Sequence, residues 1–562
     1  MDTTGDYAWI MASTALVFMM VPGIALFYSG LRSQTTALSL IWLSMMAVSV
    51  VSIQWFLFGY SLVFSQTSTS GFIGNFEYAL FLNMDKDDAF AGTRGHDTPA
   101  MVFGLFQGMF AAFTIALVTG VVAEKGRLFP FLIFSFFWTS LVYDPIAYWL
   151  WNSQGWGNSM GGLDWAGGTP VHICSGAATL AYTVVLKYIR VTTDDTHSIT
   201  SISRDVGSWK KYLFSRAQRR ERLPSGPTAL EAGLESHNMT NAMLGMLLVW
   251  FGWFGFNAGS ELKANMRAVS TFIATNLAAC SGGVAYTLLE RMAGQKWSGL
   301  GFCTGAFAGL VAITPGAGYV PPWAALIFGS TAAAVVFGFE AIKWLEDFLE
   351  EPLHITIIHG VGGLWGMFLT GIFADSHLGD LDNSHFPGGA ISGKGKQIRI
   401  QLAGGFGGFF YSFFATLGLL IIMQFLSIYF PSLELRARSR RGALVNLDEE
   451  ELEDTGAYRL TCHHHPLTAD PYASRPGSAI YTGRPSLSPS LQNQPQSHRH
   501  HLQHQQYIEM DGHSPTSFSH SQYHGMSPQN TRTRSDVGMP ARIGQVAYDS
   551  GGSRGSRGSG SR

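Results

Sequence analysis

The stretch Asp164–Gly176, DWAGGTPVHICSG, places the ionisable side chain of His172 in a run of apolar and small residues. Apolar sequence continues to residue 188. Because about 20 mostly apolar residues cross a bilayer as a helix, residues 167–188 are predicted to span a membrane. An ionisable side chain inside a span is costly to bury, which makes His172 a candidate functional residue.

The composition of the whole chain indicates a membrane protein. Of 562 residues, 47% are hydrophobic and 13% are charged, whereas soluble domains carry about 25% charged residues. The 65 glycines are typical of closely packed membrane helices. This composition excludes an ordinary cytosolic enzyme and a fully disordered protein. The net charge of −2 gives no reason to expect binding to nucleic acid.

The composition changes abruptly near Pro431. The first 430 residues hold 39 of the 40 phenylalanines and all 15 tryptophans, and the polar remainder is rich in Ser, Gly, Pro, Gln and His. Such a polar composition is typical of disorder. We therefore predict a transmembrane domain over residues 1–430, a polar segment over 431–460 and a disordered tail over 461–562.

The transmembrane domain is predicted to be all-α, with eleven membrane-spanning helices. No basic residue precedes the first apolar run, which is therefore interpreted as a span and not as a signal peptide. The eleven segments lie at roughly residues 7–31, 37–64, 100–123, 128–150, 167–188, 239–258, 268–290, 299–315, 322–342, 353–374 and 399–430.

The distribution of basic residues predicts the orientation. With the N-terminus outside, internal loops hold 15 Lys and Arg residues and external loops hold seven. Basic residues favour the cytoplasmic side, so the N-terminus is predicted outside and the C-terminus inside. Six of the internal basic residues lie in Lys210–Arg222. A solvated loop is the simpler interpretation of that segment, and contact with anionic membrane lipids or with the tail is the alternative.

A second intramembrane histidine, His359, lies in the run IIHGVGG of the tenth predicted span. The fifth span starts outside and the tenth starts inside, as in an inverted repeat of spans one to five over six to ten, followed by one extra span. At 1.5 Å per residue each histidine would lie only ~8–10 Å inside a ~30 Å core, so either the predicted span boundaries are too tight or funnel-shaped vestibules enter from both sides. No Cys, Asp or Glu recurs at metal-site spacing, so neither a metal nor another cofactor is expected.

Four motifs, in this order, resemble those of the ammonium transporter, methylammonium permease and Rhesus family. They are QGMFA (from Gln107), DWAGGTPVHICSG (from Asp164), GWFGFNAGS (Gly252–Ser260) and HGVGG (from His359). The long tail and the histidine at position 172 resemble the fungal twin-histidine, high-affinity ammonium permeases. The resemblance implies a homotrimer of eleven-span subunits in the plasma membrane, each with its own pore.

The resemblance also implies roles for individual residues. A cation over an indole ring gains roughly 0.5–2 kcal/mol without a counter-charge. The implied outer ammonium site consists of Trp151 and Ser260, with Asp164 in a structural and field-setting role. The implied gate consists of Phe110 and Phe256, accompanied by Gln107 and Phe106, and the implied pore is lined by His172 and His359.

The implied activity is transport of ammonium and methylammonium. Neutral ammonia crosses an apolar pore far more cheaply than a cation, so the site must remove a proton, and two neutral imidazoles can accept and relay it. The proton either travels with ammonia or stays behind. The alternatives are an ammonium sensor and a Rhesus-type gas channel; Trp151 and Ser260 argue against the latter. No nucleophile–base set indicates an enzyme.

Several polar residues receive secondary interpretations. Ser439 and Ser535 follow arginines and are candidate phosphorylation sites for a kinase that acts on the tail. The acidic segment Asn446–Tyr458 partly resembles the family's docking segment, which implies that residues 431–460 form a cytoplasmic regulatory segment. Its acidic run could pair with the basic loop 210–222, with solvated charge as the alternative. Asp144 is expected to satisfy a kink in its helix. His354 stands where relatives often carry Asp, so the charge of the inner vestibule does not follow from the resemblance.

Overall fold

The computed structural model describes residues 4–33, 36–84, 89–90, 98–122, 126–194, 238–349, 351 and 353–436. The chain divides into two units, residues 1–466 and 467–562, and every described residue belongs to the first. The segments 210–222 and 446–458 and the candidate phosphorylation sites Ser439 and Ser535 lie outside the described residues.

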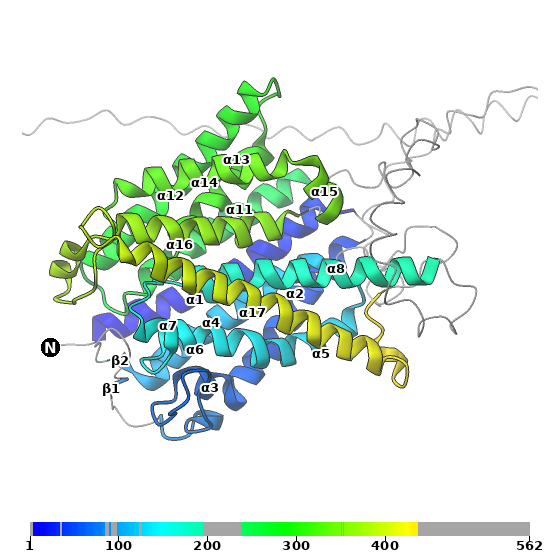
Figure 1. Ribbon diagram of the computed structural model, residues 1–562, viewed down its shortest axis with the longest axis horizontal. Helices are drawn as coiled ribbons and strands as arrows, with labels where there is room; N and C mark the ends of the chain where they lie inside the picture. The colour runs from blue at the N-terminus through cyan, green and yellow to red at the C-terminus, as the bar shows by residue number, and fades with distance from the viewer. Residues whose placement is uncertain are drawn as a thin grey trace, which may run out of the picture. The chain divides into compact units, whose positions relative to one another are not determined.

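The described part of the chain is almost entirely helical (Figure 1), and its one small sheet pairs β1 (Ala89–Phe90) with β2 (Thr98–Pro99). Helices α11 to α14 and α16 gather on one side of the bundle, and α3, α5 and α6 lie on the other. The helices are α1 (Thr4–Leu31), α2 (Ala37–Gln54), α3 (Tyr60–Phe64), α4 (Ala100–Val118), α5 (Leu128–Trp138), α6 (Asp144–Trp151), α7 (Trp156–Ser159), α8 (Cys174–Asp194), α11 (Met239–Gly259), α12 (Met266–Met292), α13 (Gly299–Ile313), α14 (Ala324–Glu340), α15 (Lys343–Leu349), α16 (Gly362–Phe373) and α17 (Lys396–Leu426).

Side-chain caps set where several of these helices begin. The Asn238 side chain accepts a hydrogen bond from a backbone N–H in the first turn of α11, and Asn265 and Ser298 do the same for α12 and α13. Asn and Ser are preferred at this position because their side-chain oxygen satisfies an otherwise unpaired N–H. Short polar residues between the apolar runs therefore fix the starts of these three helices.

Nine helical stretches among the described residues are long and apolar enough to cross a membrane. The predicted eighth and ninth spans form α13 and α14, which are shorter apolar helices of 15 and 17 residues. After Ile313 the chain stays fully buried as far as Val320 without remaining helical. Turns inside the protein thus replace part of the expected eighth span, and the count of eleven stays a prediction.

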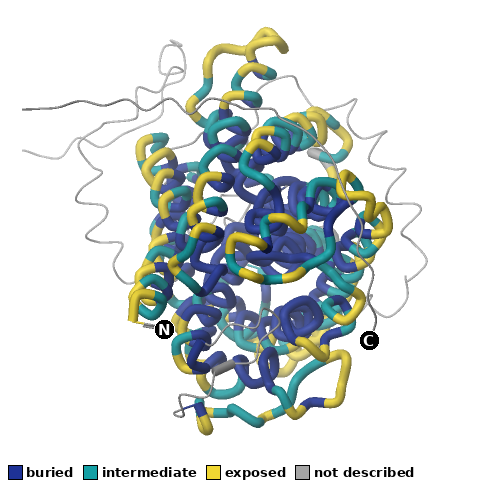
Figure 2. Tube along the Cα trace, turned by 90° about the vertical axis from the view of Figure 1, so that its left-hand side faces the viewer, coloured by how far each residue is buried: buried dark blue, intermediate teal, exposed yellow. Residues whose placement is uncertain are grey.

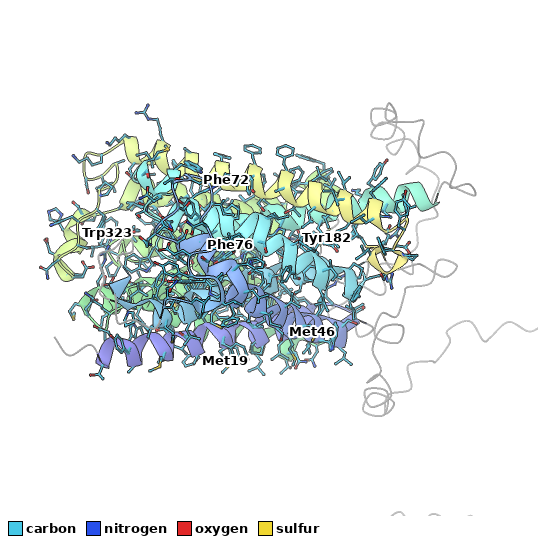
Figure 3. All side chains as sticks on the ribbon, turned by 90° about the horizontal axis from the view of Figure 1, so that it is seen from below. Met19, Met46, Phe72, Phe76, Tyr182 and Trp323 are labelled. Carbon is cyan, nitrogen blue, oxygen red and sulfur yellow. The ribbon has the colours of Figure 1, made fainter. Side chains whose placement is uncertain are left out.

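Buried residues concentrate in the middle of the bundle, and exposed ones lie along its outer faces and loops (Figure 2). The exposed residues include large apolar side chains such as Met19 and Phe76, whereas Tyr182 is fully buried (Figure 3). An apolar outer surface of this extent is expected of a protein surrounded by lipid.

Small residues allow the backbones of neighbouring helices to touch. A Cβ atom on Gly245 of α11 would overlap the backbone of Phe27 in α1, and one on Gly305 of α13 would overlap the carbonyl oxygen of Gly282 in α12. Close packing through small residues is the main source of helix association in lipid. It explains the high glycine content of the chain.

The chain that leaves α17 returns to the loop between α4 and α5. Leu435 is fully buried, and its carbonyl oxygen accepts a hydrogen bond of 3.0 Å from the backbone N–H of Arg127. Gly126 and Arg436 form an isolated antiparallel bridge beside it. Residues 431–436 are therefore attached to the transmembrane body.

We expect Gly305→Ala to lower the apparent melting temperature of the detergent-solubilised protein by several degrees. Its new methyl group would overlap Gly282 O and Tyr286 Cβ, and overpacking of this kind typically costs about 1–3 kcal/mol. Gly338→Ala is the matched control, because a Cβ there meets no atom within 4 Å. Equal melting temperatures for the two variants would contradict the prediction.

Candidate functional site

The two intramembrane histidines lie in direct contact. The Nδ1 atoms of His172 and His359 are 3.2 Å apart, and the ring centroids are 5.3 Å apart with planes inclined by 26°. Both side chains are buried, His172 completely. The histidines are therefore not separated by the distance that the predicted span boundaries imply. Each helix begins inside the protein, because the chain before it is already buried, so depth cannot be counted from the helix end.

His172 lies in a π-helical turn, Gly168–Ile173, that Asp164 caps. The Asp164 carboxylate accepts hydrogen bonds from the backbone N–H groups of Gly167, Gly168 and Thr169, at 3.0, 2.6 and 2.7 Å. Burial raises the pKa of Asp164 above its usual value, and these donors oppose the rise. Asp164 thus holds the start of the helix that carries His172.

Glu351 plays the corresponding part for His359. Its carboxylate accepts hydrogen bonds from the backbone N–H groups of Ile355 and Thr356 at the start of the π-helical turn Thr356–Val361. Burial likewise raises the pKa of Glu351, and the bonds from Thr356, the charge of His354 and the bond from Ile355 oppose the rise.

In sequence, each capping carboxylate precedes its histidine by eight residues, and in each case the third residue after the acid has a positive φ: Gly167 at +103° and His354 at +53°. Glu351 was not predicted as a functional residue. The shared spacing was the signal that could have identified it.

His354, the departure from the family pattern, belongs to a polar cluster at the same end of its helix. Its Nδ1 lies 2.9 Å from Oε1 of Glu340, and the Tyr286 hydroxyl donates to the same carboxylate. The position at which relatives often carry Asp therefore holds an imidazole beside a carboxylate.

Two phenylalanine rings cover His172. The rings of Phe110 and Phe256 stack with centroids 4.2 Å apart and planes inclined by 22°, and the Phe256 ring lies 6.1 Å from the His172 ring. Phe106 packs edge-on against Phe110 at 4.9 Å. Both stacked rings are fully buried, and the Phe256 ring is the nearer of the two to His172.

Trp151 and Ser260 converge on this stacked pair. The Trp151 ring meets the Phe110 ring edge-on at 5.9 Å, and the Ser260 hydroxyl donates to the carbonyl oxygen of Phe256 at 2.8 Å. Trp151 Nε1 donates to the backbone oxygen of Asp164 at 3.1 Å. The carbonyl of Asp164 thus orients the indole while its carboxylate caps the helix.

Gln107 lies one turn before Phe110 on α4 and is 8% exposed. Its side-chain oxygen Oε1 accepts no hydrogen bond from the described residues. A buried acceptor left open costs free energy unless a ligand or water satisfies it. Gln107 therefore offers a polar atom beside the aromatic gate.

Two aromatic residues that sequence reasoning did not assign enclose the histidines. Trp253 stacks on His172 at 5.2 Å and donates from Nε1 to Thr314 Oγ1, and Phe307 meets His359 edge-on at 5.7 Å. Trp253 lies inside the GWFGFNAGS motif, which was a usable signal. Phe307 lies in an apolar run without a distinguishing neighbour, so the sequence contained no signal that could have identified it.

Asp144 begins α6 directly after the π-helical turn Thr139–Tyr143. It is fully buried, and Gln54 Nε2 donates to its Oδ2 at 2.8 Å. The position fits the expected role at a helix irregularity. Among the described residues, no three His, Cys, Asp or Glu side chains are grouped so as to hold a metal ion.

The sequence model of the Ammonium Transporter Family matches residues 8–204 and 217–444. The chain belongs to the ammonium transporter family. It is 39% identical to Ammonium transporter 1 of Schizosaccharomyces pombe, over 88% of this chain and 90% of that protein. It is 38% identical to Ammonium transporter MEP2 of Saccharomyces cerevisiae, over 80% and 81%. The crystal structure of Candida albicans Mep2 matches with a TM-score of 0.64 and 36% identity, over 77% and 86%.

The resemblance stated from the four motifs is therefore confirmed. Ammonium transporter family proteins are transporters or channels and not enzymes, and this member is a multi-pass membrane protein.

We expect Asp164→Ala to destabilise the protein by about 2 kcal/mol or more, because three backbone N–H groups lose an ionised acceptor inside the protein. Asp164→Asn keeps one acceptor oxygen and should lose less. Thermal unfolding in detergent measures both effects. Identical unfolding of wild type and Asp164→Ala would refute the capping role.

Proposed function

We propose that this family member transports ammonium by binding NH₄⁺ at Trp151 and Ser260, removing its proton and passing NH₃ between His172 and His359. The observation that carries the proposal is the direct contact of two buried imidazoles beneath a stacked phenylalanine pair. The apolar surroundings favour a neutral permeant over a cation.

The outer site suits a small cation that can later become neutral. The indole of Trp151 offers a π face, and Ser260 offers a hydroxyl oxygen, so binding needs no fixed counter-charge. The stacked rings of Phe110 and Phe256 then separate this site from the histidines. A hydrated cation would have to lose its water shell to pass them, at a cost of several kcal/mol or more, whereas ammonia loses little.

The histidine pair supplies the chemistry for deprotonation. With both imidazoles neutral, one Nδ1 donates to the other across 3.2 Å. This leaves Nε2 of His172 without a hydrogen-bond partner among the described residues. An incoming proton on one ring can be matched by release from the other, so the pair can accept and relay it. Potassium ions have no proton to give and would be rejected.

We also propose an inverted repeat, an orientation in the membrane and an oligomeric state. The equal spacing from Asp164 to His172 and from Glu351 to His359 supports an inverted repeat within eleven spans. The excess of basic residues in alternate loops supports an external N-terminus and a cytoplasmic C-terminus. We further propose a homotrimer in the plasma membrane, with residues 1–430 as its transmembrane domain.

The remaining chain is proposed to regulate the transporter. Residues 431–460 would act as a cytoplasmic regulatory segment and 461–562 as a disordered tail, with Ser439 and Ser535 as kinase targets. The buried contact of Leu435 with Arg127 supports this idea, because it attaches the start of that segment to a cytoplasmic loop. A phosphate group on Ser439, which lies among arginines, would change the charge directly after this contact.

The transport proposal predicts saturable methylammonium uptake in cells that lack their own ammonium carriers. His172→Ala should lower uptake at least tenfold, which corresponds to about 1.4 kcal/mol of lost stabilisation or more, and Ser260→Leu should weaken uptake mainly at low substrate concentration. His377→Ala, an exposed histidine, is the control. Wild-type protein at the cell surface without uptake would falsify the proposal. An ammonium-dependent current would show that the proton follows.

The proposed orientation predicts which loops face the outside. Cysteine replacing Gly395, an exposed residue before α17, should react with a membrane-impermeant maleimide in intact cells, whereas cysteine replacing Lys296 should react only after permeabilisation. The native Cys174 and Cys303 are buried and should stay unlabelled. Labelling of Lys296→Cys in intact cells would show that the orientation is the opposite of the one proposed.

A further inference from the structure

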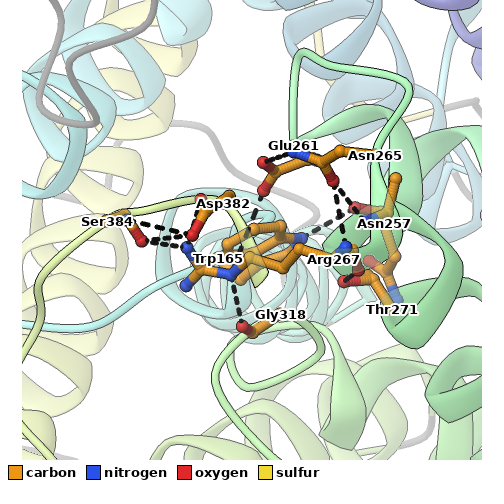
Figure 4. A network of polar contacts seen from close by, with 10 residues as sticks. Trp165, Asn257, Glu261, Asn265, Arg267, Thr271, Gly318, Asp382 and Ser384 are labelled. Atoms are coloured by element: carbon orange, nitrogen blue, oxygen red, sulfur yellow. Dashed lines mark hydrogen bonds and ion pairs between the residues drawn. The ribbon is translucent and has the colours of Figure 1, made fainter. Parts of the chain in front are cut away.

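A buried arginine, Arg267 in the first turn of α12, belongs to a network of polar and aromatic contacts (Figure 4). Its guanidinium lies over the rings of Trp165, Tyr319 and Phe386 at 4.7, 5.5 and 4.7 Å. Its Nε donates to the carbonyl oxygen of Gly318 at 3.0 Å. A planar guanidinium can stack on rings while its edge donates hydrogen bonds, so these contacts hold the arginine and the rings in one arrangement.

An ion pair attaches the loop between α16 and α17 to this arginine. Asp382 Oδ2 accepts from Nη1 of Arg267 at 2.7 Å, and the Ser384 hydroxyl also accepts from Nη1. Although burial opposes ionisation of Asp382, the hydrogen bonds from Ser384 and Arg267 and the positive charge of Arg267 hold its pKa below the usual value. The carboxylate is therefore ionised at neutral pH, and the loop is held on the first turn of α12.

Trp165 connects the arginine to the end of α11. Its Nε1 donates to the backbone oxygen of Asn257 at 2.7 Å, and the backbone N–H of Ser260 donates to the same oxygen at 3.3 Å. The side chain of Asn257 is held separately, because its Nδ2 donates to Thr275 Oγ1 at 3.0 Å. The indole on which Arg267 stacks thus shares an acceptor with Ser260 and stabilises the turn that carries its hydroxyl.

The same tryptophan is joined to the other half of the proposed outer site. Trp165 directly follows Asp164, whose backbone oxygen accepts from Trp151 Nε1 at 3.1 Å. The backbone N–H of Trp165 donates to the carbonyl oxygen of Pro315 at 2.9 Å. A shift of Trp165 would therefore move the acceptor that orients Trp151 as well as the turn that carries Ser260.

We infer that Arg267 is a positioning residue for the proposed outer ammonium site: by stacking on Trp165, it holds Ser260 and Trp151 at the separation that a small cation requires. This inference rests on the proposed transport function. Arg267 acts through Trp165 and not through contact with the ion. Groups that bind one small ion must be held precisely by the residues behind them, so a looser Trp165 should weaken binding of the ion.

The test is the concentration dependence of methylammonium uptake by the full-length chain, with surface abundance measured for every variant. Arg267→Lys keeps the positive charge beside Asp382, but an ammonium group is not planar and cannot stack on Trp165 in the same way. We expect KM to rise about fivefold, as for the loss of one cation–π contact, with the maximal rate per transporter unchanged. Arg291→Lys, the same substitution at the exposed end of α12, is the matched control and should keep the wild-type KM.

Trp165→Phe tests the path from the arginine to Ser260. Phenylalanine keeps a ring for the guanidinium but has no Nε1 to donate to Asn257, so KM should again rise about fivefold. Because both substitutions interrupt the same path, the double variant Arg267→Lys/Trp165→Phe should raise KM little beyond the larger single effect. Effects that multiply in the double variant overturn the inference.

A purely structural role of Arg267 gives a different result. It predicts a lower maximal rate per transporter with KM unchanged, and that outcome, or an equal rise of KM in Arg291→Lys, overturns the inference while leaving transport itself established. If Arg267→Lys does not reach the cell surface, an unchanged KM in Trp165→Phe overturns it. A wild-type chain at the cell surface without uptake overturns the proposed function, and the inference with it.

Discussion

The contact between His172 and His359 depends on how closely two helices approach. A Cβ atom on Gly176 would overlap the backbone of Gly360, the residue that follows His359. With any other residue at Gly176, the helices would separate and the 3.2 Å contact between the Nδ1 atoms would be lost. Gly176 therefore matters as much as the imidazoles, since it decides whether the two rings can come into contact.

The same contact requires two helices to begin in the middle of the protein. A helix start leaves backbone N–H groups unpaired, and inside a membrane protein water cannot satisfy them freely. Asp164 and Glu351 solve this problem at the two ends of the pore, each by accepting bonds from the first turn of its helix. The carboxylates of Asp164 and Glu351 are thus used mainly to bind backbone N–H groups, which leaves less of their charge to act on a substrate.

The resemblance to four family motifs named residues that the structure brings together. Phe110, Phe256, His172 and His359 were each named from a short run, and the structure brings them into one stack. The sequence did not predict the depth of the histidines, because hydropathy cannot distinguish a helix that starts at the membrane surface from one that starts in a buried turn. Phe307 was missed for a related reason. When an apolar residue lies in an apolar run, the sequence does not indicate which residue it contacts.

The transmembrane body carries little charge, and the surroundings of the histidines differ in this respect from those of Ser260. Around the histidines, the described neighbours include the uncharged aromatic rings of Trp253 and Phe307, which supply no fixed charge. Near Ser260 charge is present but buried, where the guanidinium of Arg267 lies beside the carboxylates of Asp382 and Glu261. A carboxylate exposed at the proposed outer site would hold an ammonium ion and oppose its loss of a proton.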